Sequence, residues 1–228
     1  DFAQVLGLFH TTVRAQAGAT VGSPASAAGL APWSVTQAAI NWGGGPTVLK
    51  YDANNPQNGN FGALAIDGNG ASTYQTTIEN GSTNSLCAQG QPGCADPTAT
   101  TEPGNMIGPT KKGVDYLISN TSSACDTFAE VFQVRPDGSY NLTARCNLWA
   151  GATDSKRVVL VPVIQSLCNG KCSVTVLYFA LFFLNTLDTC TGNDCQVTGQ
   201  FVKAAVNPNA VIGNLDSQGA VRSFRLTS

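Results

Sequence analysis

Eight cysteines carry the clearest chemistry in this chain, because thiols either join as disulfides or bind a metal. They are Cys87, Cys94, Cys125, Cys146, Cys168, Cys172, Cys190 and Cys195. The number is even, and proximity along the chain favours four local pairs: 87–94, 125–146, 168–172 and 190–195. We therefore expect disulfides formed in an oxidising compartment. The alternative is a zinc site made by the last four cysteines, whose C-x3-C and C-x4-C spacings differ from the paired C-x2-C of a zinc ribbon.

Conventional catalytic groups are few. His10 is the only histidine, and its spacing identifies no partner for a Ser-His-Asp or Cys-His system. Nucleophile-elbow, zinc-protease, P-loop and dinucleotide-binding motifs are all missing from the sequence. A glycosidase needs only two carboxylates and no motif, so a secreted hydrolase remains an alternative. Its candidate residues are Asp67, Glu79, Glu102, Asp115 and Glu130. We expect no enzyme, and we assign no catalytic, cofactor-binding or metal-binding residue.

One Asn-rich segment weakly resembles a calcium-binding loop. Asp52, Asn54 and Asn58 supply oxygen atoms, but Pro56 occupies the place of one ligand and no glutamate closes the loop. We therefore predict an ordinary cluster of turns and no cofactor, with a bound calcium ion as the alternative.

The charge pattern excludes several classes of partner. Only 11% of the residues are charged, against about 25% in typical domains, and the net charge is −2. The longest basic run is Lys111-Lys112, so neither nucleic acid nor a polybasic membrane contact is expected. The longest apolar stretch, residues 174–187, contains Asn185 and is shorter than the ~20 residues of a membrane helix. Surfaces built from Ser, Thr, Asn, Gln and Gly suit an extracellular protein that packs against copies of itself.

Residues 157–206 predict the core of the fold. A β-branched run begins at Arg157, and Pro162 within it indicates a bulge or a bend. Asn169-Gly170 is a strong hairpin signal, here between two cysteines. Residues 174–184 are apolar on both faces and predict a central strand. A second cysteine-flanked turn leads into a third strand, so we expect an antiparallel three-stranded meander.

The N-terminal region predicts a strand with one apolar face. The apolar positions alternate with mostly polar ones, and they are Val13, Ala15, Ala17, Ala19 and Val21. A linker of small residues follows. We divide the chain into residues 1–22, an N-terminal strand or arm that joins subunits, and residues 23–228, a single disulfide-stabilised β-rich extracellular domain.

Three short helices are expected around the sheet. Ser34 and Gln37 match a capping box that opens a helix through Ile40. Residues 72–80 predict a helix capped by Gly81, and residues 110–119 predict another, with Pro109 at its first position. The inward side chains of that last helix are Val114, Leu117 and Ile118. The fold class is mainly β with short helices (α+β): an antiparallel sheet or sandwich with long Gly/Asn-rich loops.

Several short phrases occur along the chain in a characteristic order: FAQVLG at 2–7, TVRAQA at 12–17, NFGALAIDG at 60–68, GASTY at 70–74, IENG at 78–81, EPGNMIGPT at 102–110, RVVLVPV at 157–163 and QFV at 200–202. Their order and spacing resemble the extracellular part of TadE/TadG-like proteins, which are associated with Flp (tight-adherence) pilus assembly in bacteria. Members typically begin with a prepilin-like transmembrane helix, which this sequence lacks. The resemblance implies a surface or pilus-linked role and supplies no catalytic residues.

Two main hypotheses follow. The first is a structural subunit of an extracellular bacterial filament, pilus-like or cell-surface assembly, a homopolymer in which residues 13–21 complete a neighbour's sheet by strand addition. The second is a monomeric adhesin or glycan-binding module, with surface glycans stacked on Trp33, Trp42, Trp149 and Tyr74. Both place the protein outside the cell, secreted or at the cell surface.

Overall fold

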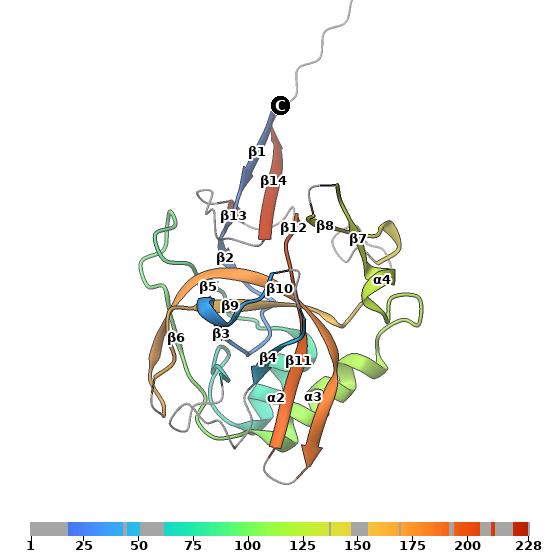
Figure 1. The fold of residues 1–228 in the computed structure, drawn as a ribbon. Coiled ribbons are helices and arrows are strands. Elements are labelled where there is room, and N and C mark those ends of the chain that lie inside the picture. Colours follow the sequence, from blue (N-terminus) through green and yellow to red (C-terminus); the bar gives the residue numbers. More distant parts are fainter. Residues whose placement is uncertain are drawn as a thin grey trace, which may run out of the picture.

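The structure is a computed structural model that describes residues 18–42, 45–50, 62–136, 138–146, 155–168, 170–191, 194–205, 211–212 and 221–227. It is mainly β with short helices, which confirms the predicted fold class (Figure 1). The helices are η1 (Gln37–Ala39), α2 (Ala71–Asn80), α3 (Ile107–Ser119), α4 (Phe128–Val131) and η2 (Ala144–Cys146). The strands are β1 (Gly18–Gly22), β2 (Pro24–Ala27), β3 (Val35–Thr36), β4 (Thr47–Lys50), β5 (Leu86–Cys87), β6 (Thr98–Thr100), β7 (Phe132–Val134), β8 (Tyr140–Leu142), β9 (Val158–Ile164), β10 (Ser173–Thr191), β11 (Asp194–Val202), β12 (Ala204–Ala205), β13 (Val211–Ile212) and β14 (Val221–Thr227).

The largest sheet contains the predicted meander. Its order is β3-β9-β10-β11-β4, with β6 paired to the start of β10. Strands β9, β10 and β11 pair antiparallel in sequence, as expected. The edge strand β3 is parallel to β9, so the sheet is mixed rather than purely antiparallel. The strands not foreseen from the sequence are mostly short ones, whose two to four residues carry little periodic signal.

Strand β10 is buried on both faces, which confirms its central place. One face packs beneath α2 and α3 through Tyr178, Ala180, Phe182 and Leu184. The other face carries Phe179, Leu181 and Phe183. The ladder to β9 shifts between Val176 and Tyr178, so Val176 joins the face of Phe179 despite its even number. The sequence predicts an irregularity at Pro162 of β9. In the structure the extra residue is in β10 instead, one step along the ladder from the pair of Pro162 with Phe179.

Helices α2 and α3 pack closely against each other and against the sheet. Val114 and Leu117 are buried, and Ile118 packs against the same cluster, as predicted. A side chain at Gly113 would bring its Cβ to 2.6 Å from Ile78 Cγ2, so the glycine permits the close approach. Helix α3 begins at Ile107 rather than Thr110, which places Pro109 inside its first turn, where the missing N–H costs no helical hydrogen bond.

The capping box predicted at Ser34 is wrong. The Ser34 hydroxyl donates to the carbonyl of Gly62 at 3.0 Å, and only a 3-10 turn, η1, follows. Tertiary contact with a distant loop thus outcompetes the local cap. A capping box does form elsewhere, where Thr127 opens the short helix α4 together with Glu130.

All four predicted cysteine pairs are present, so the zinc alternative does not hold. Their Cα atoms lie 5.5 Å apart in 87–94, 5.7 Å in 125–146, 6.4 Å in 168–172 and 4.1 Å in 190–195. The last pair joins directly facing residues of β10 and β11. Four disulfides are typical of an oxidising, non-cytoplasmic compartment.

No helix within the described residues combines the length and the apolar character that a transmembrane span requires.

Candidate functional site

A two-stranded ribbon projects from the body of the molecule and is formed by β1 and β14 (Figure 1). The strands pair antiparallel over five positions, from Gly18–Thr227 to Gly22–Ser223. Of the predicted subunit-joining positions, Ala19 pairs with Leu226 and Val21 pairs with Phe224 of the same chain. The other three, Val13, Ala15 and Ala17, lie outside the described residues.

The ribbon belongs to a five-stranded sheet with the order β1-β14-β12-β8-β7. Strand β1 is therefore an edge strand, and its second edge pairs with no strand among the described residues. An exposed edge presents backbone N–H and C=O groups that can pair with another chain.

Strand β7 forms the opposite edge of this sheet. The carbonyl of Val131 accepts from Thr143 N, and Arg135 N donates to the carbonyl of Ser139, so alternate residues bond toward β8. By that alternation the N–H and C=O of Val134 point outward, away from β8. The Val134 side chain is 68% exposed, the highest fraction recorded for a large hydrophobic residue in the described part of the chain. Counting the described strands alone, the sheet thus has an open edge at each end.

Two of the candidate carboxylates stabilise turns. Asp67 accepts hydrogen bonds from the backbone of Thr83 and Asn84 and from the hydroxyls of Thr83 and Thr77. Partial burial opposes ionisation of Asp67, but these hydrogen bonds outweigh it and hold its pKa below the ordinary value. Hydrogen bonds from Thr127, first from its backbone, likewise lower the pKa of Glu130, which completes the capping box of α4.

The remaining three carboxylates differ in environment. Asp115 pairs with Lys111 one turn away on α3. Glu79 Oε1 accepts from Gln75 at 2.7 Å. Glu102 is buried, and its Oε2 has no hydrogen-bond partner within the described ranges. Four of the five carboxylates therefore have hydrogen-bond or ion-pair partners that explain their positions, and Glu102 Oε2 is the exception among the described residues.

The predicted alternative of a calcium site and the lone histidine both concern segments outside the described residues. The Asn-rich segment with Asp52, Asn54 and Asn58 lies outside the described residues, as does His10. Over the residues that are described, no group of three or more His, Cys, Asp or Glu side chains is placed to hold a metal ion.

The predicted aromatic platform for glycans is wrong for Trp33 and Tyr74, because both side chains are buried. Trp33 is fully buried and donates from Nε1 to the Tyr74 hydroxyl at 2.7 Å. Burial raises the pKa of Tyr74 far above its ordinary value, so this phenol stays neutral. Trp42 packs edge-on against Phe201, and Trp149 lies outside the described residues. Trp33 and Tyr74 thus lie in the core, and Trp42 packs against it.

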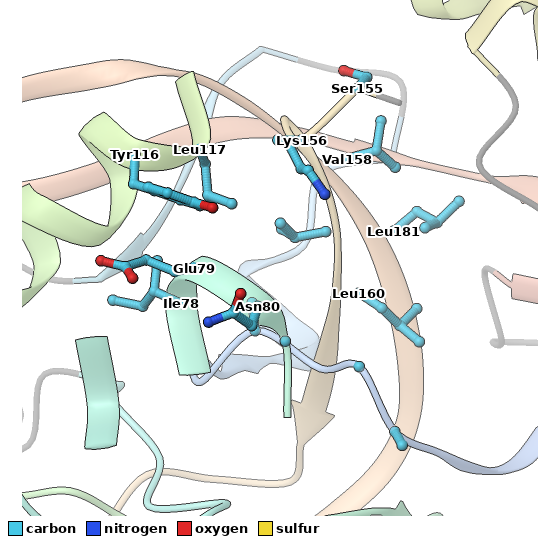
Figure 2. A pocket seen from close by; sticks show the side chains of 15 residues that line it. Ile78, Glu79, Asn80, Tyr116, Leu117, Ser155, Lys156, Val158, Leu160 and Leu181 are labelled. Carbon is cyan, nitrogen blue, oxygen red and sulfur yellow. The ribbon is translucent and has the colours of Figure 1, made fainter. Parts of the chain in front are cut away.

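A pocket of about 320 Å³ lies where α2 and α3 meet β9 (Figure 2). Its apolar wall includes Ala31, Ile78, Leu117 and Leu181, all buried. One rim is the end of α2 and the following Gly81, whose φ of +75° suits glycine; a Cβ there would lie 2.9 Å from the backbone of Gly29. The pocket is thus built from five segments of the chain (28–31, 78–81, 116–117, 155–160 and 181), which no local pattern could have revealed.

Several polar groups surround the mouth of this pocket. Figure 2 shows the Tyr116 hydroxyl, the Asn80 amide and the Lys156 ammonium turned toward the same space, with Glu79 at the rim. Tyr116 is 40% exposed. Asn80 uses Nδ2 to donate to the carbonyl of Thr76, which leaves its Oδ1 for other contacts.

Comparison of this chain with protein-family models, with curated proteins and with solved structures finds no match.

Proposed function

We propose that this protein is a structural subunit of an extracellular bacterial filament or cell-surface assembly, in which copies join by adding strands at the sheet edges. The observation that carries the proposal is the projecting β1–β14 ribbon, in which the outer edge of β1 has no partner among the described strands. Strand β14 pairs with β12 only at Val221 and Arg222, so over residues 223–227 the ribbon has two strands in the described structure. A two-stranded ribbon is at best marginally stable in water, so a third strand from another copy would stabilise this part.

The outer edge of β7 would allow an assembly of more than two copies. Because β1 and β7 end the same sheet, one copy can contact two neighbours through two different edges. Such head-to-tail contacts form open filaments or closed rings rather than isolated dimers. Exposed Val134 on β7 would lose water contact in such a junction.

Composition and chemistry agree with this role. The low charged fraction of 11% reduces repulsion and desolvation cost between packed copies. The four disulfides suit a protein that works outside the cell. The resemblance to TadE/TadG-like proteins of pilus assembly points in the same direction. We assign no catalytic step to the chain.

Negative-stain microscopy and sedimentation of the purified protein test the proposal. The full chain should form particles larger than a monomer, and a chain that starts at Ser23, without β1, should remain monomeric. Assemblies of unchanged form from the shortened chain would exclude β1 as a junction. A full chain that stays monomeric at all concentrations would refute the assembly role.

A matched pair of variants tests the β7 edge. Val134→Pro removes the outward N–H, whereas Val134→Thr keeps it and retains β-branching. We expect the proline variant to lose assembly and the threonine variant to keep it. Equal assembly by both, with both folded, would show that β7 is not a junction.

A further inference from the structure

We propose that the pocket between α2, α3 and β9 is a binding site for an uncharged sugar ring, such as the terminal unit of a surface glycan. The pocket is separate from the strand edges discussed above, so this inference does not depend on assembly. Its volume of about 320 Å³ lies at the lower end of the range typical of ligand pockets, roughly 300–1,000 Å³. The occupant must therefore be small, or be one end of a longer molecule.

The walls of the pocket are rigid and pre-formed. Gly113 lets α3 approach Ile78 of α2, and Gly81 lets the end of α2 approach Gly29. Ile78 and Leu117 belong to the main hydrophobic cluster that also contains Tyr178 and Phe182 of β10. Because these backbone positions are fixed by the core, a ligand would not have to order them on binding.

The polar groups at the mouth provide both hydrogen-bond donors and acceptors. Lys156 supplies an ammonium donor, Asn80 Oδ1 is an acceptor, and the Tyr116 hydroxyl can act as either. Sugar hydroxyls donate and accept at the same atom, so they match such a mixed set.

Charge and shape favour a neutral ligand with one apolar face. The mouth has a carboxylate and an ammonium, and the adjacent C-terminal end of α2 carries a partial negative charge, so neither a simple anion nor a simple cation is selected. The Tyr116 ring is exposed beside an apolar wall, where the C–H face of a pyranose can stack. The Tyr116 hydroxyl has no hydrogen-bond partner among the described residues, which leaves it available to a ligand.

Saturation-transfer NMR on the full chain is the test, with the methyl glycosides of glucose, galactose, mannose and N-acetylglucosamine as probes. We expect transfer to at least one of them. Tyr116→Ala should reduce that signal at least tenfold, and Tyr116→Phe should reduce it several-fold because the ring remains without its hydroxyl. Lys112→Ala, an exposed α3 residue that does not line the pocket, is the matched control and should leave the signal unchanged.

Circular dichroism melts of each variant establish that it is folded. Absence of transfer to every probe in the wild-type protein would overturn the proposal. Unchanged transfer to folded Tyr116→Ala would also overturn it, because binding would then occur elsewhere. Microscopy of the same preparations reports on assembly independently.

Discussion

Replacement of both Cys125 and Cys146 by alanine should destabilise the protein more than loss of a short disulfide does. The two cysteines are 21 positions apart, whereas Cys168 and Cys172 are 4 positions apart. The loop-entropy relation gives about 3 kcal/mol for the longer loop and about 2 kcal/mol for the shorter one at 25 °C. The doubly substituted Cys168/Cys172 variant is therefore the matched control.

Packing adds to the difference between the two pairs. Cys125 and Cys146 are both fully buried with Val131 and Phe132, so truncation to alanine also removes buried sulfur, which costs roughly 1 kcal/mol. Cys168 and Cys172 are only partly buried. We expect a loss of about 4 kcal/mol for the first variant and about 2 kcal/mol for the control.

Urea unfolding followed by circular dichroism measures the loss of unfolding free energy in both variants directly. The slope of the unfolding free energy against urea should also rise in the Cys125/Cys146 variant, because the unfolded chain without that link exposes more surface. The melting temperature should fall on the order of 10 °C. Neighbouring contacts, such as the Ser155 hydroxyl bonded to the carbonyl of Cys125, remain in both proteins. An equal or larger loss in the control variant would refute the loop-entropy reasoning.

Two further predictions concern the helices and the pH dependence. Gly113→Ala should destabilise the protein by about 1–3 kcal/mol, because the added Cβ meets Ile78 at 2.6 Å. Gly108→Ala, which has open space around it, should stabilise the protein by up to about 1 kcal/mol. Thermal unfolding of both variants distinguishes them, and equal effects would contradict the packing argument. The folded pKa of Asp67 lies below its ordinary 3.8, so the stability it contributes is present above about pH 4 and is lost as the pH falls through the folded pKa. Asp67→Asn should therefore flatten the acid limb of a stability–pH profile measured by urea unfolding, and an unchanged limb would exclude this role.

Local features of the fold could be predicted from the sequence, and long-range ones could not. The cysteine pairs and the β9–β10–β11 meander were predictable because their members follow one another along the chain. The pairing of β1 with β14 was not, because about 200 residues separate the strands and neither contains a signal for the other. At Ser34 a contact with Gly62 replaced the local cap that the sequence favours.

The candidate pocket could not be predicted from the sequence either. Asn80, Tyr116 and Lys156 are ordinary surface residue types, and only the packing of α2, α3 and β9 brings them together. Conversely, Trp33 and Tyr74 looked suitable for a ligand, yet both are buried in the core, where Trp33 Nε1 donates to the Tyr74 hydroxyl. Aromatic residue type alone does not separate these two situations.

Strand β10 has a consequence for how the molecule unfolds. Its 19 residues contribute side chains to all three hydrophobic clusters of the described structure. Detaching this strand from either neighbour removes support from every cluster at once, so separate melting of one region is disfavoured. Although the apolar interior is divided into three parts, denaturation should proceed as a single cooperative event.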